Sequence, residues 1–317
     1  MNTNAGSTSK GSLDRMRNWT WLILLCSAST FAQLTPPPFF KAADSLHKPR
    51  RNFVAISEAS LATAALVGLD RLWYADFPRS SFQFINDNDE WLQMDKAGHI
   101  FTAYYVGEVG ANTLRWAGVS KSDQLLYGGT LGFAFLTAVE VMDGFSAEWG
   151  ASLGDVAANG LGTGLYIGQE LLWNEQRIRL KFSFSRSEYA ALRPNKLGEN
   201  YLQEVLKDYN GQTYWLSANV HSFLKEESRF PRWLNVAFGY GGEGMLAGTI
   251  EDQRRLFPGS SDPYRQFYLS LDIDLTKIET RSKFLRSLFK TINFIKVPAP
   301  ALEITTNGDF KFHSFHF

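Results

Sequence analysis

The 317-residue sequence contains a single cysteine, Cys26, and carries no net charge. Cys26 lies in an apolar run near the N-terminus, so a chain cleaved after that run keeps no thiol for a disulfide, a thiolate metal site or a cysteine nucleophile. Lysine plus arginine and aspartate plus glutamate number 32 each, so no basic field favours nucleic acid as a partner. Phosphate-binding glycine loops, the G-x-S-x-G motif and the H-E-x-x-H motif are also missing, which removes several common enzyme classes.

The first 32 residues have the layout of a secretory signal peptide. Two arginines precede the apolar run WTWLILLCSASTFA, which ends in small residues, and we expect cleavage after Ala32. Lipidation of Cys26 is disfavoured, because Leu25 is bulky where a small residue is needed. The sequence therefore predicts export to the cell envelope, at the outer membrane or in the periplasm, with a proline-containing linker over residues 33–52 after the signal peptide.

Four apolar segments rich in glycine and alanine follow, over about 54–74, 95–118, 122–143 and 150–174. Each is long enough for a helix that crosses a bilayer or a thick core, and the small residues permit close contact between helices. Charged residues interrupt all four segments, and a mean hydropathy of −0.20 is low for a multispanning protein. A tightly packed bundle and a membrane-embedded bundle with inward-facing charges both remain open for the domain over 53–177.

The periodicity changes at residue 178, where apolar and polar residues begin to alternate, which predicts amphipathic strands. The alternating stretches cover 178–185, 213–224, 233–241 and 266–275. A short amphipathic helix is expected over 282–295, and Asn307-Gly308 is a strong hairpin signal between two final strands. We therefore predict an α+β fold, in which four to five apolar Gly/Ala-rich helices form an N-terminal bundle. An antiparallel β region over 178–317 follows, and we expect it to associate with the outer membrane.

Polar side chains gather in three clusters, one on each of the last three apolar segments. The clusters consist of Asp95, Lys96 and His99; Glu140 and Asp143; and Ser152, Asp155 and Asn159. In an antiparallel bundle, the end of the third segment lies beside the start of the fourth, and the start of the second can meet that same end. The connection lengths therefore predict that the three clusters converge at one end of the bundle.

Three roles are open for such a cluster. Carboxylate and imidazole groups are ligands for a divalent metal, and the expected ligands are His99, Glu140, Asp143 and Asp155. A carboxylate beside an imidazole can instead fix its tautomer and tune it as a general base. The catalytic candidates for that role are His99, Asp95, Lys96 and Ser152. The third role is a structural network of paired buried groups, or a site for a lipid headgroup, with Asn159 as a further member.

Three motifs carry a family resemblance. DKAGH (95–99), EVMDGFS (140–146) and SLGDVAANGLG (152–162) resemble the YfiM-type family of uncharacterised bacterial envelope lipoproteins, and VanZ-like membrane proteins share a looser version of the motif spacing. The resemblance covers about residues 90–175 and implies an envelope location and the same three polar clusters, without a reaction. The short family members lack the β half. The stretches FINDNDEWLQMDKAGH (84–99) and KDYNGQTYWLS (207–217) and the β half are similar to a larger group of uncharacterised exported proteins of Bacteroidetes-like bacteria.

These observations predict an exported, membrane-associated envelope protein with a structural or binding role for its Asp/Lys/His/Glu cluster. The alternative is a metal-assisted or His99-based hydrolase or transferase that acts on a lipid or cell-wall intermediate. The expected partner is a membrane lipid or another envelope component. A divalent metal is the cofactor that the residue types allow.

Overall fold

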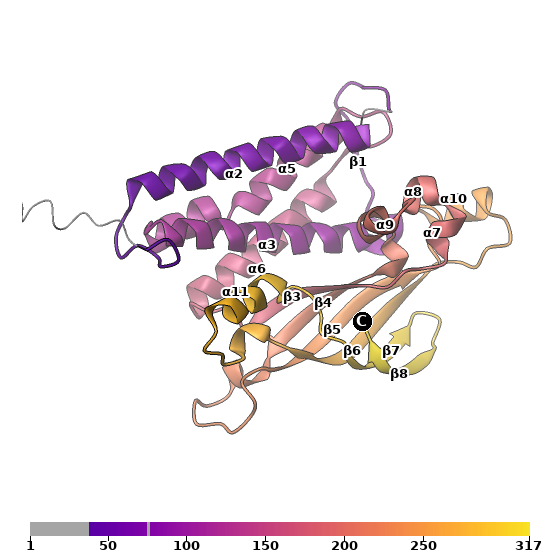
Figure 1. The fold of residues 1–317 in the computed structure, drawn as a ribbon. Coiled ribbons are helices and arrows are strands. Elements are labelled where there is room, and N and C mark those ends of the chain that lie inside the picture. The colour runs from indigo at the N-terminus through magenta and orange to yellow at the C-terminus, as the bar shows by residue number, and fades with distance from the viewer. Residues whose placement is uncertain (1–37, 75–76) are drawn as a thin grey trace, which may run out of the picture.

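The computed structural model describes residues 38–74 and 77–317, and it consists of a helical half that lies against a curled antiparallel sheet (Figure 1). The expected signal peptide and the start of the expected linker fall outside the described residues. The rest of the linker differs from the prediction, because helix α2 already begins at Lys48. His47 accepts a hydrogen bond from the backbone N–H of Arg50, and Pro49 suits the first helical turn, so the local sequence starts the helix there.

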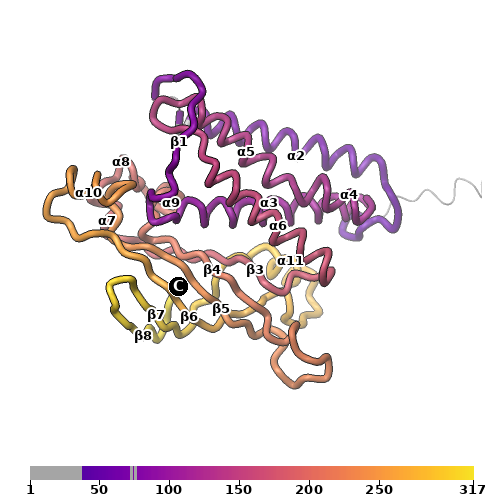
Figure 2. The backbone as a smooth tube through the Cα atoms, turned by 180° about the vertical axis from the view of Figure 1, so that it is seen from behind, coloured from indigo at the N-terminus to yellow at the C-terminus, as the bar shows by residue number. Residues whose placement is uncertain are grey.

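The described residues contain four helices of 14 residues or more in the helical half. They are α2 (Lys48–Leu69), α3 (Met94–Trp116), α5 (Leu131–Gly144) and α6 (Leu153–Leu172). Shorter elements join them: η1 (Asp70–Tyr74), β1 (Phe84–Ile85), η2 (Glu90–Gln93), α4 (Lys121–Asp123), η3 (Gln124–Gly128) and β2 (Ala151–Ser152). In both views α3 lies between α2 and the sheet, with α6 beside it (Figures 1 and 2).

The pattern of the third apolar segment predicted one continuous α-helix, and the structure differs from that prediction. It contains α4, the wide turn η3 and then α5. At this interruption the backbone lies close to α3, since a Cβ on Gly128 would lie 2.4 Å from the backbone nitrogen of Ala111. The glycine-rich composition therefore serves close backbone contact, as the sequence indicated.

The C-terminal half is a sheet of six strands in the order β3-β4-β5-β6-β7-β8, each antiparallel to its neighbours. The strands are β3 (Ile178–Phe184), β4 (Gln212–Asn219), β5 (Leu234–Glu243), β6 (Tyr264–Ile273), β7 (Ala299–Thr305) and β8 (Phe310–His316). The predicted change to antiparallel strands at residue 178 and the hairpin at Asn307-Gly308 are confirmed, and Gly308 has the positive φ of 89° that this turn needs. The strand expected over 213–224 ends earlier, because Asn219 accepts from the N–H of Ser222 and starts the turn η5 (Val220–Phe223).

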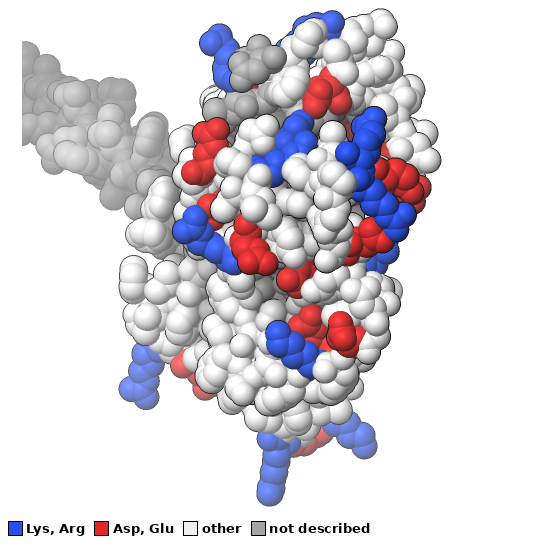
Figure 3. All heavy atoms as spheres, turned by 90° about the vertical axis from the view of Figure 1, so that its right-hand side faces the viewer, with Lys and Arg blue, Asp and Glu red and all other residues white. Residues whose placement is uncertain are grey.

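Short helices lie at two places around the sheet. Helices α7 (Tyr189–Leu192), α8 (Pro194–Leu197), α9 (Tyr201–Lys207) and α10 (Ile250–Leu256) gather at one end of it, on the right of Figure 1. Charged side chains are frequent at this end of the molecule (Figure 3). The predicted amphipathic helix is α11 (Lys283–Ile292), and the single turns η4 (Tyr209–Gly211) and η6 (Leu275–Lys277) complete the connections.

Aromatic side chains join the two halves. Phe101 on α3 packs against Phe182 of β3 and Tyr214 of β4, with ring centroids 5.9 Å and 5.8 Å apart. Tyr104, one turn along α3, is fully buried and makes an edge contact with Tyr166 of α6. The core between α3, α6 and the first two strands therefore holds α3 in place relative to the sheet.

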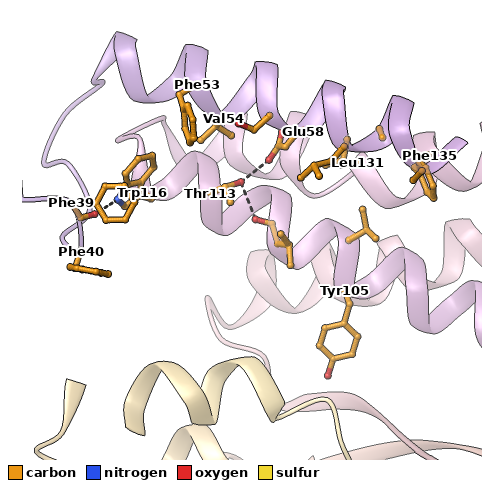
Figure 4. A pocket seen from close by; sticks show the side chains of 16 residues that line it. Phe39, Phe40, Phe53, Val54, Glu58, Tyr105, Thr113, Trp116, Leu131 and Phe135 are labelled. Carbon is orange, nitrogen blue, oxygen red and sulfur yellow. Dashed lines mark hydrogen bonds between the residues drawn. The ribbon is translucent and has the colours of Figure 1, made fainter. Parts of the chain in front are cut away.

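An apolar groove of about 800 Å³ lies where α2 crosses α3 and α5 (Figure 4). Phe53 and Leu131 contribute to its wall, and Glu58 reaches into it from α2 to accept a hydrogen bond from the hydroxyl of Thr113, at 2.7 Å. Burial raises the pKa of Glu58 although this hydrogen bond opposes the change. Among the residues that the structure describes, two helical stretches, Lys48–Leu69 and Lys121–Gly144, are by length and composition apolar enough to cross a membrane.

Candidate functional site

The three polar clusters predicted from the sequence meet around one cavity of about 290 Å³. The cavity lies at the first turns of α3 and α6 and the last turn of α5, so the helix directions bring the clusters together as the connection lengths required. The predicted residues that line it are Asp95, Lys96, His99, Glu140, Asp143 and Asp155. Ser152 and Asn159 stand directly behind this wall and hold its members by hydrogen bonds.

The start of α3 is set by an uncommon backbone segment. Trp91, Leu92 and Gln93 are three consecutive non-glycine residues with positive φ, at 47°, 51° and 61°. Each left-handed residue costs on the order of 1 kcal/mol or more, so the surroundings must hold the segment. The backbone N–H of Trp91 donates to the carbonyl of Gly248 at 2.7 Å, and the hydroxyl of Tyr240 donates to the carbonyl of Leu92. The sheet half therefore fixes where α3 begins and where its first polar residues point.

His99 is oriented by a buried amide. Its Nδ1 lies 2.9 Å from Oδ1 of Asn159, and because an amide oxygen only accepts, Nδ1 carries the hydrogen. In the neutral ring, Nε2 is then left with its lone pair, 3.8 Å from Asp95 Oδ1 and 3.7 Å from Glu140 Oε1. Asn159 is itself fully buried, and its amide nitrogen has no hydrogen-bond partner among the described residues. The Nε2 edge of the imidazole is therefore directed at two carboxylates.

Lys96 bridges two carboxylates at the edge of the cavity. Its ammonium group lies 2.8 Å from Oδ1 of Asp87 and 3.0 Å from Oδ1 of Asp155. Ser152 donates its hydroxyl to Asp87 at 2.6 Å and accepts the backbone N–H of Asp155, so it caps α6. Its own backbone N–H donates to Oε2 of Glu140 at 2.9 Å. Lys96 and Ser152, both named as catalytic candidates from the sequence, thus have their polar atoms engaged with the acidic groups of the site.

The cavity brings several acidic groups together in a partly desolvated site. Six carboxyl groups line it, against one lysine and one histidine. Burial raises the pKa of Glu140 to about 7, that of Asp155 to about 7 and that of Asp143 to about 6. For His99 burial acts in the opposite sense, but the nearby carboxylates, Asp95 first, outweigh it and raise the pKa. The site therefore favours a bound positive charge.

Three residues bring ligand atoms close enough together to hold a metal ion. Asp95, His99 and Asp155 each offer one ligand atom, and these atoms all lie within 4.8 Å of one another. Glu140, an expected ligand, lies next to Nε2 of His99. Asp143, another expected ligand, accepts a hydrogen bond from the hydroxyl of Tyr74 at 2.6 Å. The set that the structure brings together thus contains Asp95, which the sequence had placed among the catalytic candidates.

Several residues of the cavity were missed by the sequence analysis. Asp87, Glu90 and Trp91 line it from the segment before α3, and Tyr74 and Tyr209 contribute hydroxyl groups. Tyr209 comes from the sheet half and donates to Asp95 at 3.0 Å. The acidic run NDNDE at 86–90 was the available signal, because it directly precedes the first cluster.

Fold and cavity together define a helix-and-sheet protein with an acidic site that contains one histidine. Residues 83–168 match the family model described as predicted periplasmic lipoprotein (DUF2279). The matched segment holds all eight residues of the three clusters, and the family description supports an exported envelope protein of unknown activity. No curated protein and no solved structure matches the chain.

Without added metal, the free energy of unfolding is expected to rise by about 1–2 kcal/mol as the pH falls from 8 to 5.5. The folded pKa of Glu140 and of Asp155, about 7, exceeds the ordinary values of 4.5 and 3.8, so the folded state binds these protons more tightly than the unfolded state. The raised pKa of His99 acts in the same sense. The contribution of these groups to the free energy of unfolding is fully present below their unfolded pKa values. It is lost as the pH rises through their folded values, near 7 for Glu140 and Asp155. Urea unfolding in chelator at both pH values measures it, and a stability that increases toward pH 8 contradicts it.

Proposed function

We propose that this chain is an envelope protein, at the outer membrane or in the periplasm, that associates with a membrane and binds a divalent cation in its acidic cavity. The proposed ligands are Asp95, His99 and Asp155, with Glu140 beside them. The observation that carries the proposal is the orientation of His99: Asn159 holds Nδ1, so Nε2 faces Asp95 and Glu140, and burial raises the pKa of Glu140. The resemblance to the YfiM-type family and to VanZ-like motif spacing, in which the same clusters recur, belongs to this proposal.

The donor set fits a divalent cation of intermediate hardness. Carboxylate oxygens alone suit Mg²⁺ and Ca²⁺, whereas the addition of one imidazole favours Mn²⁺, Fe²⁺ or Zn²⁺. A ligating histidine normally donates its other ring N–H to a neighbour that fixes the ring, and Asn159 has that position here. Lys96 already compensates Asp87 and one oxygen of Asp155, so the cation would compensate the carboxylates nearest to His99. Bound there, it would supply a positive centre for an anionic group of a lipid or cell-wall component.

Equilibrium dialysis followed by elemental analysis tests this proposal. Wild-type protein is expected to retain about one equivalent of Mn²⁺ or Zn²⁺, and His99→Ala and Asp155→Asn should each weaken binding by at least about tenfold. Asn159→Ala keeps every ligand and removes only the partner of Nδ1, so we expect a loss of about 10- to 100-fold. Glu227→Gln is the control, because it removes one carboxylate from an exposed loop and should bind like wild type.

Two outcomes would reject the cation. One is the absence of stoichiometric metal in folded wild-type protein with Mn²⁺, Zn²⁺ and Mg²⁺ alike. The other is retention of metal by His99→Ala at wild-type affinity, since this places the ion elsewhere. Circular dichroism of each variant distinguishes a lost ligand from a lost fold.

A second candidate function rests on the same free Nε2. In a hydrolase or transferase acting on a lipid or cell-wall intermediate, His99 would accept a proton directly, with Asp95 and Glu140 as orienting groups. The ligand atoms of Asp95, His99 and Asp155 lie within 4.8 Å of one another, and this clustering favours the cation over a general base. Turnover of a chromogenic phosphodiester or ester by metal-free protein, lost in His99→Ala, would reverse this order.

A further inference from the structure

The sheet has apolar side chains on its outer face. Five residues are successive cross-strand partners along one row, which runs from β4 to β8: Leu216, Phe238, Leu269, Leu302 and Phe312. A second row lies two residues further along: Tyr240, Phe267, Ile304 and Phe310. In the part of the chain that the structure describes these rows stay largely uncovered, with Phe238 58% and Phe312 61% exposed. The outer face is thus a continuous apolar surface several strands wide.

The inner face of the same sheet is polar. Lys181 of β3 and Asp272 of β6 are fully buried and form an ion pair at 2.9 Å. Ser217 of β4 donates to Asp272 at 2.6 Å, and Asn235 of β5 donates to Ser217 at 2.8 Å. The ammonium group of Lys296, from the connection after α11, lies over the ring of Trp215. Polar side chains therefore make up much of the interior, beside the buried cluster of Trp215, Ala237 and Tyr268, whereas apolar side chains dominate the buried face of a sheet in a water-soluble protein.

The sheet curls around this polar interior. The backbone of Phe182 in β3 donates to the carbonyl of Phe294 and accepts from the N–H of Lys296, so the connection after α11 pairs with the β3 edge. The hydroxyl of Ser185, which follows β3, donates to the backbone oxygen of Phe317, which follows β8, at 3.1 Å. The end of the last strand of the sheet therefore lies beside the end of the first. The alternation of apolar outward and polar inward residues is typical of antiparallel strands that face lipid.

We propose that the outer face of β5 to β8 lies against the hydrocarbon of a phospholipid bilayer. In the part of the chain that the structure describes, Phe101 of α3 covers the outer face at Phe182 and Tyr214, and the segment before α3 covers it at Tyr240. An apolar surface of this width is unfavourable in water, and burying it against hydrocarbon removes that cost. The inference specifies the surface for the membrane association proposed above and is independent of the cation.

Helix α11 supplies a second observation that points to lipid. Phe284, Leu285 and Leu288 are exposed on it, and Phe284 is 72% exposed. Arg281, Lys283, Arg286 and Lys290 are basic, and residues 281–292 contain no acidic side chain. A short helix with an exposed apolar stripe and several cations fits an anionic lipid headgroup layer. Its connection to β7 pairs with the edge of the sheet, so α11 lies next to the curled sheet.

Site-specific fluorescence tests the proposal on the full chain, because Cys26→Ser leaves no other thiol. The emission of an environment-sensitive fluorescent label on Phe312→Cys or Phe238→Cys should shift to shorter wavelength when phosphatidylethanolamine/phosphatidylglycerol vesicles are added. Lipids that carry a spin label on the acyl chain should quench this emission. The same label on Ser261→Cys, in the exposed loop after α10, should keep its aqueous spectrum.

Charge variants test the headgroup contact. Arg286→Glu with Lys290→Glu should weaken binding to the anionic vesicles by about tenfold or more. Arg254→Glu with Arg255→Glu on α10 changes the same charge at the other end and should leave binding within about twofold.

An aqueous spectrum at Phe312→Cys in the presence of vesicles overturns the proposal. So does a spectral shift that occurs without vesicles in a dimer seen by sedimentation, because a second copy of the chain then covers the face. Metal retention is unaffected by either outcome, so this test and that of the cation fail separately.

Discussion

Gly162→Ala is expected to lower the free energy of unfolding by about 3 kcal/mol or more, although it adds a single methyl group. A Cβ at this position would lie 2.1 Å from the carbonyl oxygen of Ile100, which belongs to the backbone of α3. A backbone atom cannot rotate away as the end of a flexible side chain can, so α3 and α6 must separate. Ile100 follows His99 directly, and therefore the same displacement should also weaken cation binding.

Gly164→Ala provides the matched control in the same helix. No atom lies within 4 Å of a Cβ built on Gly164, so the change removes only the entropic cost of glycine in a helix. We expect it to be neutral or to stabilise by about 0.5–1 kcal/mol. Urea unfolding of the two variants measures the difference directly. Equal stabilities for both would show that α3 and α6 are not in backbone contact at Gly162.

The sequence was sufficient for features that depend on local pattern. Small residues in all four apolar segments indicated close helix contacts, and backbone contacts occur at Gly128 and Gly162. Alternation beginning at residue 178 predicted the strands, and short connections between helices predicted that the three polar clusters meet. Each of these inferences needs only periodicity, residue size or connection length, which are properties of neighbouring residues.

The rest of the site depends on contacts distant in sequence. Trp91 and its two successors have positive φ without any glycine, because Gly248 and Tyr240 from the sheet half hold them. Tyr209, which contacts Asp95, also comes from that half. No local pattern specifies such partners. The sequence therefore located the three polar clusters but missed Tyr209, which the sheet half contributes to the cavity.

Alternation also leaves one question open in the sheet. It shows that Leu180 and Phe182 share a face and that Lys181 points the other way, but it does not say which face is buried. On β3 both faces are buried. Leu180 packs in the core against α3 and α6, and Lys181 points into the curled sheet, where it pairs with Asp272 of β6.

Lys181→Met is expected to lower the free energy of unfolding by about 3–5 kcal/mol, because it leaves the carboxylate of Asp272 buried without its counter-charge. The ammonium group of Lys181 lies 2.9 Å from Oδ2 of Asp272 and also donates to the carbonyl of Ile273 at 2.6 Å. Both side chains are fully buried, so water cannot replace the lost partner. Urea unfolding at pH 7 measures the loss.

A second substitution separates charge from packing. Asp272→Asn on top of Lys181→Met removes the uncompensated charge but still accepts the hydrogen bond from Ser217, so it should recover about 2 kcal/mol. Lys311→Met, on the exposed part of β8, should change stability by no more than about 0.5 kcal/mol. If Lys181→Met is as mild as Lys311→Met, water reaches the interior of the curled sheet. The polar side would then be the solvated side of an ordinary amphipathic sheet, and the apolar outer face would be the one that protein must cover.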